Sequence, residues 1–376
     1  MCTFLSLSNA FRPVSILILL AVTIGIPAPN TSSASKEGLS TNETVLLVLD
    51  DCDSDNNHKT PPYGDDIFLL KSNGELIRRL LPKLTIGSNW GAGRAVSVSE
   101  DGRYFVVCED AANKITVCET VTGKKIWSLS GVFKSAVFAN DIVYALNHES
   151  VFAIDNTGTI IKHSTIGGFD IIFDASNDCL WIVKQDIKKC SLDLKIIMTV
   201  DPIWHGACSV DINPDSSIWV ADRFVDRLKT NAPKGRLLRI SSQGSILKTI
   251  DLSISPVCVR ASKHDGSVWI TGTRERHRDF SMFGEDWPDT LDELNNLAGS
   301  ATEYHTFKYD SEGKLLLSIP QGGNSIDLEP SDGSIWIAGR KKIWHYSGTG
   351  LNLAMHTDIP DSRKCLVVIP KKSKGK

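Results

Sequence analysis

Few residues of this 376-residue chain stand in patterns that carry chemistry by themselves. Asp51, Asp53 and Asp55 alternate along an acidic run, as the first ligands of a calcium loop do, because hard cations take several oxygens from a tight turn. Asn56 stands where such loops prefer glycine, and Pro62 stands where a glutamate would close the site. The run therefore predicts either a site for a divalent cation such as calcium or a solvated acidic loop.

Three charged residues, Asp211, Arg260 and Asp327, occupy one position of a repeated pattern that is described below. Such a trio either binds a polar ligand or pairs with itself, since charges removed from water survive when they are paired. His205, in Trp204-His205-Gly206, precedes one of these segments. It is either a base or ligand, or a hydrogen-bonded loop residue.

A long insertion carries the remaining candidate side chains. Arg274, Arg276 and His277 are charged or titratable, and Trp287 follows within an aromatic stretch. A short helix is expected from Asp289 to Gly299, which are suitable capping residues. The insertion is interpreted as a small binding lid, with an inert flap as the alternative.

Other classes of function lack their signatures. The formal net charge is −3, and the only basic run is the tail at 371–376, so wholesale nucleic-acid binding is not expected. No Ser-His-Asp order, phosphate-cradling glycine loop or Cys-x-x-Cys motif is present. Catalysis is therefore less favoured than binding.

The elements that position these residues come from an internal repeat. Residues 326–338, 259–271 and 210–221 share a strand, a turn with Asp and Ser, and a strand with an apolar-Trp pair. A second hairpin follows in most copies, and four antiparallel strands form one propeller blade. The landmark residues recur with a base period of about 38: Phe105, Tyr144, Trp181, Trp219, Trp269 and Trp336.

One more period after the last copy predicts a strand at 365–369, after which the chain has no partner strand. The missing strands occur at 44–50 and 67–80, so the C-terminal strand is expected to complete an N-terminal blade and remove a sheet edge. The prediction is an all-β, seven-bladed β-propeller over residues 44–370, with six blades as the alternative. In this arrangement Cys52 and Cys365 lie near each other and could form a disulfide.

Three intervals exceed the base period, and each excess falls between the second and third strands of a blade. The insertions are 51–66, 223–234 and 274–304. Connections at that position leave the same face of a propeller, and long loops on one face are often functional. This face is therefore the predicted binding face.

The N-terminus resembles an export signal. Arg12 precedes an apolar run at 14–26, and Ser32-Ser33-Ala34 suits a cleavage site. We expect a signal peptide at 1–34, a linker at 35–43 and a periplasmic or extracellular location. The apolar run is short for a helix that spans a bilayer, so no stable membrane span is expected after signal removal. An uncleaved membrane anchor is the alternative.

The segment from Trp204 to Asp222 resembles the repeats of the NHL and streptogramin-lyase-like propellers, and weaker resemblance extends over 44–369. The lyases of that group use a metal held by His and Glu; His205 alone matches such a place. The resemblance therefore implies an exported module that binds a protein or a small polar ligand. The alternatives are a metal-assisted lyase or hydrolase and a quinoprotein-like redox propeller.

Overall fold

The computed structural model describes residues 45–49, 65–84, 95–109, 112–200, 206–223, 235–275, 302–339, 342–356 and 365–369. They all belong to the larger of two compact units, Leu39–Lys376; the other unit is Met1–Gly38. The described residues form strands and turns without a helix. Among them, no helical segment is long and apolar enough to cross a membrane.

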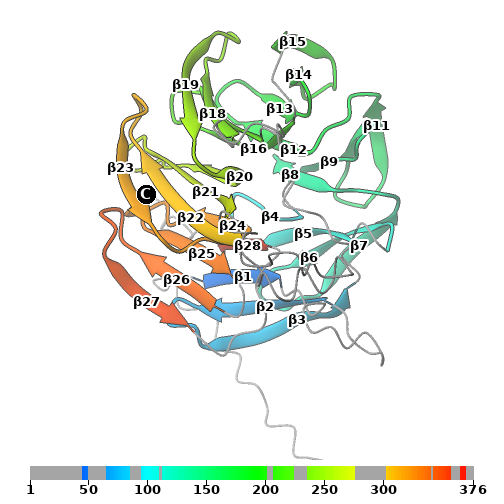
Figure 1. Ribbon diagram of the computed structural model, residues 1–376. Coiled ribbons are helices and arrows are strands. Elements are labelled where there is room, and N and C mark those ends of the chain that lie inside the picture. Colours follow the sequence, from blue (N-terminus) through cyan, green and yellow to red (C-terminus); the bar gives the residue numbers. More distant parts are fainter. Residues whose placement is uncertain are drawn as a thin grey trace, which may run out of the picture. The chain divides into compact units, whose positions relative to one another are not determined.

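Seven four-stranded antiparallel sheets form a ring, which confirms the predicted seven-bladed propeller (Figure 1). We number the blades along the chain, and each is given from its inner to its outer strand. Blade 1 is β28 (Cys365–Ile369), β1 (Val45–Leu49), β2 (Asp65–Lys71) and β3 (Leu76–Leu84). Blade 2 is β4 (Val96–Val98), β5 (Tyr104–Glu109), β6 (Lys114–Glu119) and β7 (Lys125–Ser130). Blade 3 is β8 (Ser135–Ala139), β9 (Ile142–Leu146), β10 (Val151–Ile154) and β11 (Ile160–Ser164).

The other four blades follow the same order. Blade 4 is β12 (Asp170–Asp174), β13 (Cys179–Val183), β14 (Ile187–Ser191) and β15 (Ile196–Val200). Blade 5 is β16 (Ala207–Ile212), β17 (Ile218–Arg223), β18 (Gly235–Ile240) and β19 (Ile246–Leu252). Blade 6 is β20 (Ser255–Ala261), β21 (Val268–Glu275), β22 (Thr302–Tyr309) and β23 (Leu315–Ile319). Blade 7 is β24 (Ser325–Leu328), β25 (Ile335–Gly339), β26 (Lys342–Tyr346) and β27 (Asn352–His356).

The ring closes in blade 1, where the C-terminal strand β28 pairs antiparallel with β1 from Val45↔Ile369 to Leu49↔Cys365. Each inner strand contacts the inner strands of both neighbouring blades, and β28 lies between β24 and β4. The predicted closure is therefore confirmed, and the six-bladed alternative is excluded by the seven sheets.

The repeated Asp-x-Ser-apolar-Trp pattern is explained by a turn and a buried ring. Asp215 Oδ1 accepts hydrogen bonds from Ser217 N at 2.9 Å and Ser217 Oγ at 2.6 Å, and Asp265 holds Ser267 in the same way. Short polar side chains close such turns by binding the backbone two residues on. The tryptophans that follow are fully buried between blades: Trp181, Trp219, Trp269 and Trp336.

The first copy of the pattern has a different landmark from the one that the sequence predicted. Phe105 packs against β1 and β2 of the preceding blade, whereas Trp219 packs toward the following blade. Ser99 N bonds Tyr104 O just as Asn213 N bonds Ser217 O, so Val106 is the true counterpart of Trp219. The assignment of Phe105 was wrong by one residue, and one residue reverses the direction of a strand side chain.

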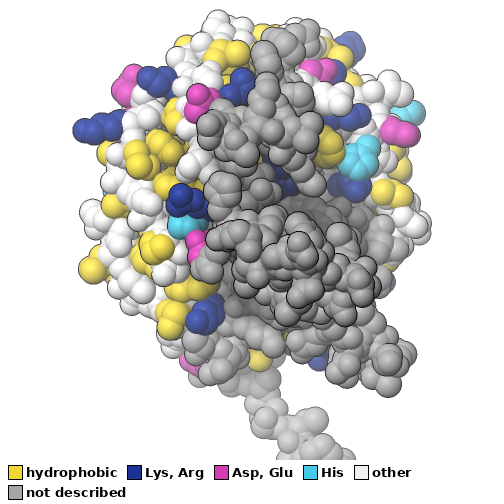
Figure 2. Space-filling view, viewed as in Figure 1, with side chains coloured by type: hydrophobic (Ala, Val, Ile, Leu, Met, Phe, Trp, Pro, Cys, Tyr) yellow, Lys and Arg dark blue, Asp and Glu magenta, His cyan; other side chains and the backbone are white. Residues whose placement is uncertain are grey.

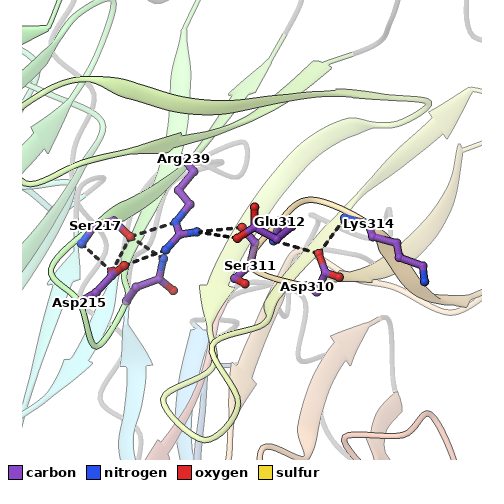
Figure 3. Close-up of polar contacts among 8 residues, drawn as sticks. Asp215, Ser217, Arg239, Asp310, Ser311, Glu312 and Lys314 are labelled. Carbon is purple, nitrogen blue, oxygen red and sulfur yellow. Dashed lines mark hydrogen bonds and ion pairs between the residues drawn. The ribbon is translucent and has the colours of Figure 1, made fainter.

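In each of blades 4, 5 and 6, a cation of the third strand donates to a backbone carbonyl of the next blade, and we call this contact the clasp. Arg239 of β18 lies over Trp219 at 5.9 Å, binds Asp215 Oδ2 at 2.7 Å, and donates from Nη1 to Ser311 O at 2.8 Å (Figure 3). Lys189 donates in the same way to Ser242 O at 2.9 Å, and Lys308 donates to Gly348 O at 2.7 Å. These carbonyls all belong to turns between a third and a fourth strand.

Replacing Arg239 with methionine is expected to lower the free energy of unfolding by about 1–3 kcal/mol, because the bond to the Ser311 carbonyl and the cover over Trp219 are lost. Urea unfolding measures the change. Lys314→Met is the matched control: Lys314 binds Asp310 through its backbone N, so the substitution should change stability by less than about 0.5 kcal/mol. Equal stability of the two variants would contradict the clasp.

The connections divide between two faces of the ring. Because neighbouring strands are antiparallel, turns from first to second and from third to fourth strand lie on one face, the turn face. Connections from second to third strand and from one blade to the next lie on the other, the insertion face. The long connections at 50–64, 224–234 and 276–301 all join second and third strands, as predicted.

Candidate functional site

The inner strands of the ring are joined to one another by side chains that bind backbone groups. Ser209 Oγ accepts from Val259 N at 3.3 Å, and Ser325 Oγ accepts from Leu366 N at 3.0 Å. Asp170 Oδ2 does the same for Val210 N at 3.1 Å. The inner edge of a blade has no further strand to pair with, and these bonds satisfy its backbone groups.

The charged trio lies two residues further along the inner strands, as Asp211 does relative to Ser209 and Asp327 relative to Ser325. Asp211, Arg260 and Asp327 are paired with Trp219, Trp269 and Trp336 on the adjacent strands, so they occupy equivalent places in blades 5, 6 and 7. The other blades place uncharged residues there: Ser97, Val137, Ile172 and Val367. The predicted alignment of the trio is therefore correct.

Each carboxylate of the trio binds the next inner strand. Asp211 Oδ2 accepts from Ala261 N at 2.8 Å, and Asp327 Oδ2 accepts from Val368 N at 2.7 Å. Arg260 lies between them, with Nε 3.4 Å from Asp327 Oδ1 and with its side chain 10% exposed. The geometry favours the structural role for the trio over ligand binding.

The electrostatics of the trio follow from its burial. Burial acts to lower the pKa of Arg260, but Cys258, Asp327 and Asp211 together outweigh it and raise the pKa. Burial raises the pKa of Asp327 above its ordinary value, although Arg260 and the Val368 amide act in the opposite direction. Arg260 is therefore a cation whose charge opposes the rise in the pKa of Asp327 that burial causes.

Cys365 carries a free thiol, which donates to Val96 O at 3.8 Å across the junction between blades 1 and 2. Burial raises its pKa to about 11. Cys52, its expected disulfide partner, lies outside the described residues. Cys208 donates to Pro256 O at 3.3 Å and Cys258 to Ile326 O at 3.9 Å, so these two thiols point to successive blades rather than toward each other.

Several predicted site residues lie outside the part of the chain that the structure describes. These are the possible calcium ligands Asp51, Asp53 and Asp55, and the candidates His205, Arg276, His277 and Trp287. Arg274 is described: it is exposed on the insertion face, near the end of β21 and paired with Glu303 of β22. Within the described ranges, no three His, Cys, Asp or Glu side chains are grouped to hold a metal ion.

The structure also brings together a group that the sequence did not single out. Lys134, His148 and Lys184, which we call the basic patch, come from blade connections on the insertion face. Lys134 N bonds Leu146 O at 2.8 Å, and Lys184 Nζ donates to His148 O at 2.8 Å. Figure 2 shows basic and histidine side chains beside one another over the region of β9.

The loop of His148 is held by its neighbours. Asn147 Oδ1 accepts from Glu149 N at 2.9 Å and Ser150 N at 2.8 Å, which fixes the turn. The His148 ring meets Phe169 edge-on, with ring centroids 5.2 Å apart. An alignment of the blade sequences could have revealed part of this group. His148 and Lys184 both lie in the connection between the second and third strands, in successive blades.

Two ammonium groups act electrostatically on His148 within the basic patch. Partial burial, followed by the ammonium groups of Lys134 and Lys184, lowers the pKa of His148, although Glu149 opposes the shift. Lys184 gives its hydrogen bond to a carbonyl rather than to a carboxylate, so that bond leaves its charge uncancelled. An anionic group is the natural complement of such a surface.

Comparison with known proteins supports the fold alone. No protein-family model matches the chain, and no curated protein matches it in sequence. Hydrazine synthase from Kuenenia stuttgartiensis matches in structure with a TM-score of 0.59 and 13% identity, over 74% of this chain and 90% of that one. A functionally unknown protein from Desulfotomaculum acetoxidans matches with a TM-score of 0.59 and 10% identity, over 86% and 98%.

Proposed function

We propose that the protein is an exported propeller that acts as a binding module, and that it holds a negatively charged ligand or protein partner on its insertion face. The observation that carries the proposal is the basic patch on the face where the long connections emerge. Export rests on the signal-like N-terminus, and a mature chain that begins after Ala34 is expected on N-terminal sequencing.

The turn face is a poorer candidate because its polar groups are used locally. Asp155, Asp215, Asp265 and Asp310 each accept backbone hydrogen bonds within their own turns. No observation among the described residues favours the metal-assisted lyase or the redox propeller.

Binding of fluorescent poly-L-glutamate and of citrate tests the proposal. Wild-type protein should bind poly-L-glutamate with an affinity that falls as salt rises, since exposed charges are screened. Lys134→Gln/Lys184→Gln should weaken binding by about tenfold, the effect of roughly 1.4 kcal/mol. Lys195→Gln/Lys314→Gln, on the turn face, removes the same charge and is the matched control.

Two results would overturn the proposal. One is an equal loss of binding in both double variants, which would show that overall charge rather than the basic patch attracts the anion. The other is the absence of binding by the wild type to either probe. Binding of citrate but not of the polymer would identify a small polar ligand rather than an acidic protein.

A further inference from the structure

The junction between blades 7 and 1 is built differently from the three junctions that precede it. In blades 4, 5 and 6 one basic side chain, Lys189, Arg239 or Lys308, both covers the buried tryptophan and donates to the next turn. At the closing junction two histidines divide these tasks.

His345 takes the place over the tryptophan. It is paired with Trp336 on the adjacent strand, as Arg239 is with Trp219. Its ring stacks on Trp336 with centroids 3.8 Å apart and an interplanar angle of 6°, and its Nε2 lies 2.9 Å from Ser334 Oγ. Arg239 Nε makes the corresponding bond to Ser217 Oγ at 3.2 Å.

His356 takes the place at the neighbouring blade. Its Nε2 donates to Ser72 O at 3.1 Å, in the turn between β2 and β3 of blade 1. A Cβ added at Gly74 of that turn would lie 2.4 Å from His356 Nδ1, so the turn closes tightly on the ring. His356 also lies parallel to Trp336, with centroids 6.2 Å apart.

The two imidazoles therefore share a place that holds one positive charge in the preceding blades. A single proton on the pair reproduces the charge of Lys189, Arg239 or Lys308. A second proton adds a like charge within the same partly buried group of rings, and both repulsion and desolvation disfavour it.

Among the residues that the structure describes, charged groups from two turns lie near the pair. Asp332 and Glu329, in the turn before β25, face His345 and favour its protonation, whereas burial and His356 lower its pKa. Burial also lowers the pKa of His356, against the Ser72 carbonyl. Lys71 and Glu75 flank the turn that holds Ser72, and they form an ion pair with each other.

We propose that the junction between blades 7 and 1 is an acid-sensitive seam, closed while His345 and His356 carry at most one proton charge between them and loosened when both are protonated. The folded junction favours the less protonated pair. Its contribution to stability is therefore complete above about pH 6.5, the ordinary histidine value, and is lost as pH falls below it. Loosening here would open the ring beside the strand that closes it.

Hydrogen exchange followed by mass spectrometry tests the seam, with rates corrected for the intrinsic effect of pH. From pH 7.5 to pH 5.0, amides of β27 and of the Ser72 turn should exchange about tenfold faster in the wild type, as expected for local opening. Amides of the 310–314 turn of blade 6, where Arg239 donates to Ser311 O, form the internal control and should change by less than about twofold. His356→Gln keeps a donor for Ser72 O but does not titrate, so it should remove the acid effect.

The proposal would be wrong if the 310–314 turn gained exchange as much as β27 and the Ser72 turn, or if His356→Gln retained the acid response. Should His356→Gln fail to fold, His345→Phe keeps the stack on Trp336 and also leaves one titrating ring. A full acid response in that variant would overturn the two-charge explanation. A shared loss of protection by all seven blades would identify ordinary acid unfolding instead.

Discussion

A protein that ends at Arg363 is expected to lose its folded state or to unfold at much lower temperature. The truncation removes β28, whose side chains are almost fully buried: Cys365, Leu366, Val368 and Ile369. Burying an aliphatic side chain contributes about 1.5–3 kcal/mol, so the strand accounts for roughly 5–10 kcal/mol. That is comparable to the whole stability of a typical domain, about 5–15 kcal/mol.

The loss also exposes the backbone edge of β1, which is paired with β28 along its whole length. An unpaired, apolar edge strand invites association between molecules. Thermal unfolding by circular dichroism and size-exclusion chromatography measure the two effects. A chain that ends at Pro370 keeps β28 and lacks only the basic tail, so it is the matched control; an unchanged melting temperature in the shorter chain would refute ring closure by β28.

Arg260→Met is expected to lower the free energy of unfolding by about 3–5 kcal/mol, the usual effect of removing one partner from a buried ion pair. The variant leaves Asp327, with a side chain 20% exposed, without the guanidinium at 3.4 Å. Urea unfolding measures the loss. Lys263→Met in the neighbouring exposed turn is the control and should change stability by less than about 0.5 kcal/mol.

The loss in Arg260→Met should depend on pH in a defined direction. Burial already raises the pKa of Asp327, and removing the cation raises it further. A carboxyl with a raised folded pKa binds a proton more readily in the folded than in the unfolded state, so stability falls as pH increases. The variant should therefore be less destabilised at pH 5 than at pH 8, and a loss that grows with acidity would contradict the role of Asp327.

The sequence was sufficient to predict the features that depend on near neighbours or that recur from blade to blade. The Asp-x-Ser turn and the tryptophan after it depend on neighbours a few residues away, and their period fixed the blades and the return of residues 365–369 to the N-terminal strands. Because copies of a repeat share one register, the repeat pattern also aligned Asp211, Arg260 and Asp327 correctly.

Contacts between blades were decided by the tertiary structure alone. The sequence did not show that Asp211 binds Ala261 N, that Arg239 reaches the Ser311 carbonyl, or that Lys134 and Lys184 meet around His148. These partners depend on which face of a strand meets the next blade and on the curvature of the ring. The alternation of side chains along a strand does not determine which face meets the next blade or how the ring curves. A one-residue error, as at Phe105, turns the side chain toward the opposite neighbour.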